Sequence, residues 1–270
     1  MTRLQYCLNA STIRPTPLLE KIRIAAEIGY AAIELWHDEI EQYVAAGGTL
    51  GDLKKYVVDT GLAIPTTIYL ADWFDADTER YPQILDVCKR RMQDAATLGA
   101  KYVIASPPAG DADYALGAAR YRELLEAGES IGVQPSMEFL GFVGQLNTIE
   151  DAVDVMQRSG RSDATTILDP FHVFRGGGSV ESISNLNANQ IAISHFNDIP
   201  AEPPREQQHD PDRVMPGDGT FDLRRYLELL LATGYQGFLS LELFREDLWR
   251  KDPVEVAREG LEKMQRVVEG

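Results

Sequence analysis

The chain has 270 residues, of which 42 are acidic and 26 are basic, so its formal net charge is −16. An acidic field repels phosphate backbones, and the basic residues form no clustered stripe, which argues against nucleic acid as a partner. No run approaches the ~18 consecutive apolar residues of a membrane span, and no long apolar segment follows a basic start, so we expect a cytoplasmic protein with no membrane partner.

One unit repeats along the chain: an amphipathic helix, a glycine just after its last turn, and a short apolar run. The repeat is roughly 33 residues long, as in consecutive βα units. The glycines that mark it are Gly29, Gly61, Gly99, Gly132, Gly160 and Gly234. The apolar runs predict eight strands, in chain order LQYCLN, AAIELW, AIPTTIY, KYVIAS, VQPSMEF, TTILD, IAISHFN and FLSLEL.

Helices are expected between these strands. Thr148 and Asp151 are spaced as a capping box at a helix start. One helix face at the helical period comprises Leu223, Tyr226, Leu227, Leu230 and Leu231. Eight strands alternating with eight helices, without a linker or a change in composition, predict the α/β class and a single (β/α)8 TIM barrel over residues 1–270. A doubly wound open sheet is the alternative.

Polar residues at the ends of the apolar runs are the candidate ligands, because a TIM barrel has its active site at the carboxyl ends of its strands. Four of them suit a metal: Glu138 in SMEF, Asp169 in TILD, His195 in AISH and Glu242 in LSLE. They end strands five to eight, which are neighbours about 5 Å apart in a closed barrel, so their side chains should converge. Any one acid there would more often anchor a loop or cap a helix.

The set of four predicts a divalent metal ion. Three carboxylates in one partly desolvated pocket repel one another unless a cation neutralises them. Oxygen and imidazole ligands without sulfur suit Mn²⁺, which we expect first, and also Mg²⁺, Co²⁺ or Zn²⁺.

Two more polar residues should lie near this site. His172 comes three residues after Asp169 and should overhang the same cavity, where its imidazole would contact substrate; a purely structural histidine is the alternative. Arg213 lies in a long, proline-rich segment, residues 199–219, and loops of that length are usually lids or binding elements. Its guanidinium would bond a substrate oxygen, with a surface salt bridge as the alternative. The glycines at 176–178 lack a phosphate-binding motif and are interpreted as a flexible loop.

The motifs LDPFH, SHFND, DRVMPGDGTFDL and LSLELF resemble the xylose isomerase-like TIM-barrel superfamily of sugar isomerases and epimerases. Within it they are most similar to the inosose isomerases, densely over residues 135–245 and more loosely over the rest of the chain. The resemblance implies that His172 and Arg213 contact substrate and that the metal is held by Glu138, Asp169, His195 and Glu242. It is less specific for the amino-terminal loops, whose His37 and Trp73 would shape substrate selectivity.

The resemblance also implies a small-molecule substrate, an unphosphorylated, inosose-like keto-polyol or keto-sugar. A hydroxy-ketone that chelates the metal loses its α-proton more readily, because the metal stabilises the resulting enediolate. Glu138 and Glu242 are the candidate catalytic bases, and Glu242 is expected to be both ligand and base. Returning the proton to the neighbouring carbon gives isomerisation, which is the reaction we expect. There are two alternatives. The proton can return to the opposite face of the same carbon, as in a keto-sugar 3-epimerase, or the intermediate can lose a β-hydroxide, as in inosose dehydratase.

Two other functional classes, a nuclease and a non-catalytic binding protein, agree less well with the sequence. An AP endonuclease of the same superfamily needs several metal ions, many histidines and a cationic DNA surface, whereas this chain has four histidines and a net charge of −16. A non-catalytic sugar-binding protein has no need of two metal-bound glutamates. The sequence is compatible with a homo-oligomer but does not specify one.

Overall fold

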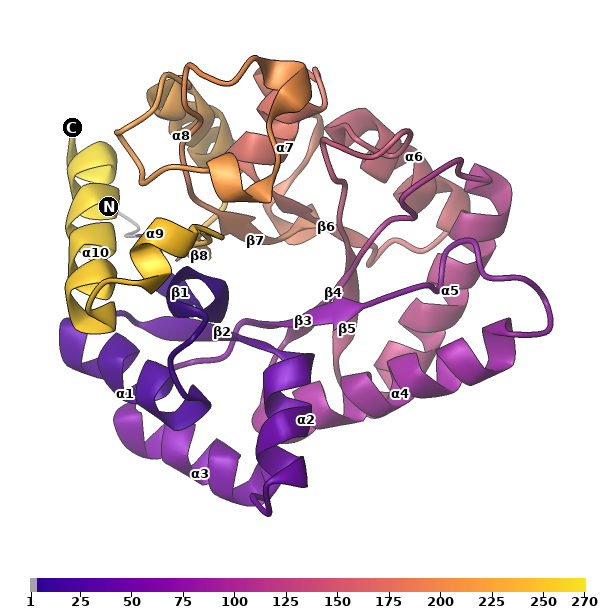
Figure 1. The fold of residues 1–270 in the computed structure, drawn as a ribbon. Coiled ribbons are helices and arrows are strands. Elements are labelled where there is room, and N and C mark those ends of the chain that lie inside the picture. Colours follow the sequence, from indigo (N-terminus) through magenta and orange to yellow (C-terminus); the bar gives the residue numbers. More distant parts are fainter. Residues whose placement is uncertain (1–3) are drawn as a thin grey trace.

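Eight parallel strands close into a barrel, and helices surround it on the outside (Figure 1). The computed structural model describes residues 4–270. Each strand pairs with the next one in the chain, and β8 pairs with β1. The strands are β1 (Gln5–Asn9), β2 (Ala32–Trp36), β3 (Thr66–Leu70), β4 (Tyr102–Ala105), β5 (Gln134–Met137), β6 (Thr165–Leu168), β7 (Ile191–His195) and β8 (Phe238–Leu241). They coincide with the eight apolar runs, so the predicted TIM barrel is confirmed and the open sheet is wrong.

The helices alternate with the strands, but two connections differ from the regular pattern. The helices are α1 (Leu18–Ile28), α2 (His37–Ala45), α3 (Leu50–Thr60), α4 (Tyr81–Leu98), α5 (Tyr114–Ile131), α6 (Ile149–Ser159), α7 (Pro170–Arg175), α8 (Leu223–Ala232), α9 (Glu246–Trp249) and α10 (Pro253–Glu269). Both α2 and α3 lie between β2 and β3. Between β6 and β7, the short α7 and 3₁₀ turns at Val180–Asn185 and Ala188–Gln190 replace one long helix. Within residues 4–270, no helix combines the length and the apolar character needed to cross a membrane.

The glycine run after α7 packs closely against the neighbouring connection. A Cβ atom at Gly176 would collide with the carbonyl oxygen of Asn147. Gly176 therefore permits close packing of two backbones, and the prediction of a flexible loop is wrong at this position.

Glycines end the helices as the repeat predicted. The residues directly after α1, α3, α4, α5 and α6 have φ angles from 69° to 101°, and they are Gly29, Gly61, Gly99, Gly132 and Gly160. Glycine adopts this left-handed conformation at little cost, which satisfies the last carbonyl groups of each helix. At the other end of α6, the predicted capping box of Thr148 and Asp151 is present.

Apolar side chains fill the space between strands and helices, and a second apolar cluster lies inside the barrel. The inner cluster comprises Ile68, Tyr102, Ile104, Ile167, Ala192 and Ile193. In α8, four of the five predicted core residues are buried, but Leu231 is 48% exposed. Leu231 lies about 80° around the helix from Leu223, at the edge of the apolar face. This packing fixes the strands, whose carboxyl ends carry the candidate site.

Candidate metal and substrate site

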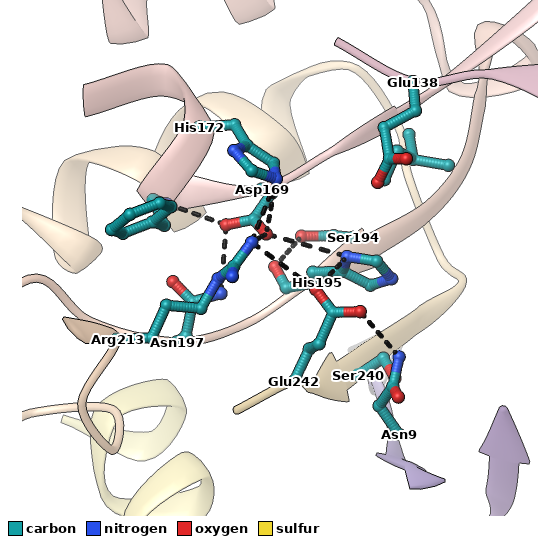
Figure 2. Close-up of polar contacts among 12 residues, drawn as sticks. Asn9, Glu138, Asp169, His172, Ser194, His195, Asn197, Arg213, Ser240 and Glu242 are labelled. Atoms are coloured by element: carbon teal, nitrogen blue, oxygen red, sulfur yellow. Dashed lines mark hydrogen bonds and ion pairs between the residues drawn. The ribbon is translucent and has the colours of Figure 1, made fainter. Parts of the chain in front are cut away.

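Three of the four predicted ligands converge where β6, β7 and β8 end. Asp169 and Glu242 directly follow β6 and β8, and His195 is the last residue of β7. One potential ligand atom from each lies within 4.8 Å of the other two. The Nδ1 atom of His195 is 3.0 Å from Oε2 of Glu242 and 3.7 Å from Oδ2 of Asp169. Figure 2 shows the three side chains pointing toward one another.

The charge around His195 fits a cation at this point. Burial alone would lower the pKa of the imidazole, but Glu242 and Glu34 raise that pKa well above its ordinary value. Neither ring nitrogen makes a hydrogen bond of good geometry to the part of the chain that the structure describes. Nδ1 of His195 thus faces the carboxylates of Asp169 and Glu242 without a hydrogen bond of good geometry to either. One imidazole nitrogen and carboxylate oxygens form a donor set that suits Mn²⁺, Zn²⁺, Co²⁺ or Mg²⁺.

The fourth predicted ligand, Glu138, lies outside this cluster. It directly follows β5, and its carboxyl group lines the cavity, apart from the other three side chains in Figure 2. The Ser106 hydroxyl donates a hydrogen bond to its Oε2 atom at 3.0 Å. Burial, reinforced by the negative charge of Glu242, raises the pKa of Glu138 to about 8. Glu138 is therefore a carboxyl group that readily holds a proton.

A buried carboxylate lies behind His195. Oε2 of Glu34, in β2, is 3.3 Å from Nε2 of His195. Glu34 also accepts hydrogen bonds from the hydroxyl groups of Thr66 and Ser240. A carboxylate on the far nitrogen of a ligating histidine fixes the orientation and tautomer of the ring. Here it leaves Nδ1 free to face Asp169 and Glu242.

Asn9, the last residue of β1, joins Glu34 to Glu242. Its amide group donates to Oε2 of Glu34 at 3.2 Å and to Oε1 of Glu242 at 3.0 Å. Its own oxygen accepts the indole N–H of Trp36 at 2.9 Å. These bonds fix the Glu242 carboxylate so that Oε2 faces His195.

Asp169 combines two roles. Its Oδ1 atom accepts the backbone N–H of Phe171 at 2.8 Å and the side-chain amide of Asn197 at 3.0 Å, and it caps α7. Its Oδ2 atom accepts from Arg213 at 3.0 Å. Burial would raise the pKa of Asp169, but Arg213 and His172 lower it well below the usual range. Asp169 is thus both a helix cap and an ionised member of the cluster.

Arg213 lies at the centre of the site and is 1% exposed. Besides Asp169, it forms an ion pair with Asp210, and its guanidinium group stacks over the ring of Phe171 at 4.5 Å. Nη2 is 3.6 Å from Oε2 of Glu242. A surface salt bridge, the alternative suggested by the sequence, is excluded by this burial.

His172 lies in α7, beside Arg213. Its Nε2 atom is 2.9 Å from Nη2 of Arg213, and its Nδ1 atom faces the backbone N–H of Gly141 at 3.2 Å. Burial lowers the pKa of His172 to about 4, so the ring is neutral near pH 7. A neutral imidazole has one acceptor nitrogen, so only one of these contacts is a hydrogen bond at a time.

A cavity of about 550 Å³ opens above the cluster. Its walls include the aromatic residues Trp36, Tyr69, Phe74, Phe142 and Phe244 and the acids Asp72, Asp75, Glu138, Asp210 and Glu242. Arg213 and His172 also line it. His37 and Trp73 do not. His37 is fully buried with Nε2 3.0 Å from the Thr67 hydroxyl, and Trp73 packs in the core against Phe74 and Tyr121.

The family is identified by comparison with known proteins. A family model described as xylose isomerase-like TIM barrel matches residues 22–267. The chain belongs to this family. It is 28% identical to inosose isomerase of Bacillus velezensis over 274 residues, which cover 98% of this chain and 97% of that protein. It is 30% identical to 3-dehydroshikimate dehydratase of Pseudomonas aeruginosa over 235 residues, which cover 85% of this chain and 36% of that protein.

A solved structure described as the IOLI protein with a binding zinc atom has the same fold. It matches with a TM-score of 0.91 and 26% identity, and the match covers 98% of both chains. The predicted membership of the xylose isomerase-like TIM barrels, and the similarity to inosose isomerases, are therefore confirmed.

Two residues of this xylose isomerase-like barrel that shape the site were absent from the set predicted from sequence. Glu34 lies inside the apolar run AIEL, and Asn9 ends the first strand. A carboxylate within an apolar strand was the available signal for Glu34, because such a group is rarely buried without a partner. Asn9 ends its strand as the four predicted ligands do, but an amide is not a preferred metal ligand.

Proposed function

We propose that this protein is a divalent-metal-dependent isomerase of an unphosphorylated keto-polyol of the inosose type. The observation that carries the proposal is the arrangement of Asp169, His195 and Glu242 as one cluster. Of these, Glu242 lines the cavity, and Glu138 lines it from outside the cluster. The similarity to inosose isomerase over nearly the whole of both chains supports the substrate class. A keto-sugar 3-epimerase and a dehydratase acting through the same residues are the alternatives, and the similarity to 3-dehydroshikimate dehydratase supports the dehydratase.

Asp169, His195 and Glu242 would hold the metal ion. When bound, the ion would polarise the carbonyl and hydroxyl oxygens of a hydroxy-ketone and make the proton on the hydroxyl-bearing carbon more acidic. Zn²⁺ is the first ion to test because the similar solved structure contains zinc, and Mn²⁺ is the second.

We assign removal of the substrate proton to Glu138. Ser106 donates to its Oε2 atom, which leaves Oε1 to accept the proton. A pKa of about 8 places this carboxyl group near the pH at which it can both accept and return a proton. Glu242, which the sequence favoured as the base, is bonded to Asn9 and lies 3.0 Å from His195 and 3.6 Å from Arg213. These donors and cations make Glu242 a better ligand than a base.

The remaining residues would bind and orient the substrate. His172 is neutral and faces the cavity, so its ring can exchange its bond to Arg213 for one to a substrate hydroxyl group. Arg213 forms ion pairs with Asp169 and Asp210 and keeps the buried Asp169 carboxylate ionised beside the substrate. The aromatic walls exclude water from the proton-transfer step.

The charges of the cavity favour a neutral substrate. Five carboxyl groups line it, and Arg213, the one lysine or arginine among the lining residues that the structure describes, is already paired with acids. A phosphate or carboxylate group on the substrate would enter this field without an unpaired lysine or arginine side chain among the described lining residues. A neutral polyol would instead use the carboxylates as hydrogen-bond acceptors.

A substrate panel followed by NMR tests the proposal. Protein loaded with Zn²⁺ or Mn²⁺ is incubated with 2-keto-myo-inositol, a neutral ketohexose and 3-dehydroshikimate. We expect the keto-inositol to be converted to a positional isomer with the highest kcat/KM. Preference for 3-dehydroshikimate, or an unsaturated product from the keto-inositol, would replace the isomerase by the dehydratase. Preference for inversion at C3 of the ketohexose would replace it by the epimerase.

A further inference from the structure

We propose that Asp198 is a positioning residue, which fixes the segment 199–221 and thereby places Arg213 beside the Asp169 carboxylate. Its importance for turnover rests on the proposed function, because Arg213 would there lie beside the substrate. Asp198 is 2% exposed and lies three residues after His195, yet it belongs to neither the metal cluster nor the cavity wall.

The Asp198 carboxylate accepts hydrogen bonds from both ends of this segment. Oδ1 of Asp198 accepts the backbone N–H groups of Ile199 at 2.8 Å and Phe221 at 3.2 Å. Oδ2 accepts those of Gly217 at 3.0 Å and Gly219 at 3.1 Å. Four N–H groups converging on one buried carboxylate hold a segment that contains only short 3₁₀ turns far more tightly than those turns would.

The backbone of Asp198 holds the segment next to Arg213. The N–H group of Asp198 donates to the carbonyl of Val214, and the N–H group of Val214 donates to the carbonyl of Asp198, both at 2.9 Å. Val214 directly follows Arg213, so the bonds of Asp198 end one residue from the guanidinium-bearing residue. The side chain and the backbone of Asp198 together fix the position of the backbone at Arg213.

Gly219 permits the close approach that these bonds require. A Cβ atom at this position would collide with Oδ1 of Asp198 and with the carbonyl oxygen of Ile199. The sequence around Gly219 is therefore adapted to Asp198, and Gly219 gives a second, independent way to disturb the same contact.

The other half of the segment is held from α7. Arg175 donates to the carbonyl oxygens of Gln208 at 2.8 Å and Glu206 at 2.9 Å. The segment, orange between β7 and α8 in Figure 1, thus forms a fixed wall of the site and not a freely moving lid. Asp169, His195 and Glu242 lie at strand ends, outside this segment. Loosening the segment should displace Arg213 and leave the metal ligands in place.

Asp198→Asn tests this inference. Asparagine has one acceptor oxygen where aspartate has two, so one pair of N–H groups would face an NH₂ group. Gly219→Ala disturbs the contact from the opposite side. Asp222→Asn is the matched control, because Asp222 in the same connection caps α8 through the N–H of Arg225 at 2.9 Å and asparagine is an equally good cap.

Three measurements are made on the full-length, metal-loaded protein. Amide hydrogen exchange reports whether residues 199–221 loosen while the strands stay protected. The side-chain Nε–H signal of Arg213, assigned by its loss in Arg213→Lys, reports solvent access to the guanidinium group, whose Nε is buried in the wild type. Kinetic constants are measured for Asp198→Asn, Arg213→Lys and the double variant.

We expect faster exchange in residues 199–221 and at Arg213 Nε–H in Asp198→Asn and Gly219→Ala, with one metal per chain retained. We expect a ~10-fold or larger loss of kcat/KM in Asp198→Asn, but less than ~3-fold further loss in the Arg213→Lys background, because the two residues act as a unit. Equal losses in both backgrounds, or an unchanged Arg213 Nε–H signal, would overturn the inference. Absence of turnover by the wild type would overturn the proposed function alone, and the two exchange measurements would still decide the role of Asp198.

Discussion

Glu34 is the buried carboxylate on which the orientation of His195 depends. It contacts Nε2 of His195 and is itself held by Asn9, Thr66 and Ser240. Glu34→Gln keeps the size of the side chain but presents a neutral group to the ring. We expect the affinity for Zn²⁺ to fall by about 10- to 100-fold, the usual effect of removing such a partner. Competition with a chromophoric chelator measures this change.

The control for Glu34→Gln is Glu246→Gln, which removes an exposed charge at the start of α9. Its affinity for Zn²⁺ should equal that of the wild type. If Glu34→Gln also binds as tightly as the wild type, the carboxylate behind His195 does not orient the ligand.

Substitution of Trp36 should mainly weaken substrate binding, whereas substitution of Trp73 should mainly lower stability. Trp36 lines the cavity, whereas Trp73 is fully buried in the core. We expect Trp73→Phe to lower the free energy of unfolding by roughly 1–3 kcal/mol, as core substitutions usually do, with KM unchanged. We expect Trp36→Phe to raise KM with a smaller loss of stability. Thermal denaturation and initial-rate kinetics on both variants measure this, and a raised KM in Trp73→Phe would restore it as a substrate contact.

Single residues were predictable from sequence where a chemical group ended an apolar run. Asp169, His195 and Glu242 met that condition, and the barrel brings them together. Glu34 did not, because its role depends on His195, which is distant in the sequence and faces it across the barrel. Trp73 shows the converse error: an aromatic residue in a loop was expected to shape substrate selectivity, but packing with Tyr121 buries it in the core.

Strands and helix ends were more predictable than helix lengths. All eight strands and the glycines after five helices were visible as local patterns. The six-residue α7 was not, because less than two turns cannot show a helical period. The bonds from Asp198 to the segment 199–221 were equally hidden, since a buried aspartate that accepts backbone N–H groups has no sequence period of its own.

The capping box of α6 provides a test of these local signals. The Thr148 hydroxyl accepts the N–H of Asp151 at 3.2 Å, and the Asp151 carboxylate accepts the N–H of Thr148 at 3.1 Å. Thr148→Ala should lower the free energy of unfolding by ~1 kcal/mol. Urea denaturation measures it, with Thr97→Ala in the last turn of α4 as the control. Equal stability of the two variants would mean that packing alone defines the start of α6.

Over the whole barrel, the metal should act as a cross-link among β6, β7 and β8. A ligand that binds the folded state stabilises it by about 2.7 kcal/mol at a free concentration 100 times its dissociation constant. Removal of metal with a chelator should therefore lower the Tm, and adding Zn²⁺ or Mn²⁺ should restore it. Differential scanning calorimetry with elemental analysis checks this. An unchanged Tm together with a metal content near zero before chelation would contradict the presence of a metal site.

The most direct test of the central claim is exchange of the substrate α-proton with deuterated solvent. Metal-loaded wild type, Glu138→Gln and Glu242→Gln are incubated with 2-keto-myo-inositol and followed by NMR. The wild type should incorporate deuterium as the isomer forms. Glu138→Gln should retain one metal per chain and lose exchange by ~10² or more, whereas Glu242→Gln should bind metal more weakly and regain exchange at high metal concentration. Exchange by Glu138→Gln at the wild-type rate would contradict the assignment of Glu138 as the base.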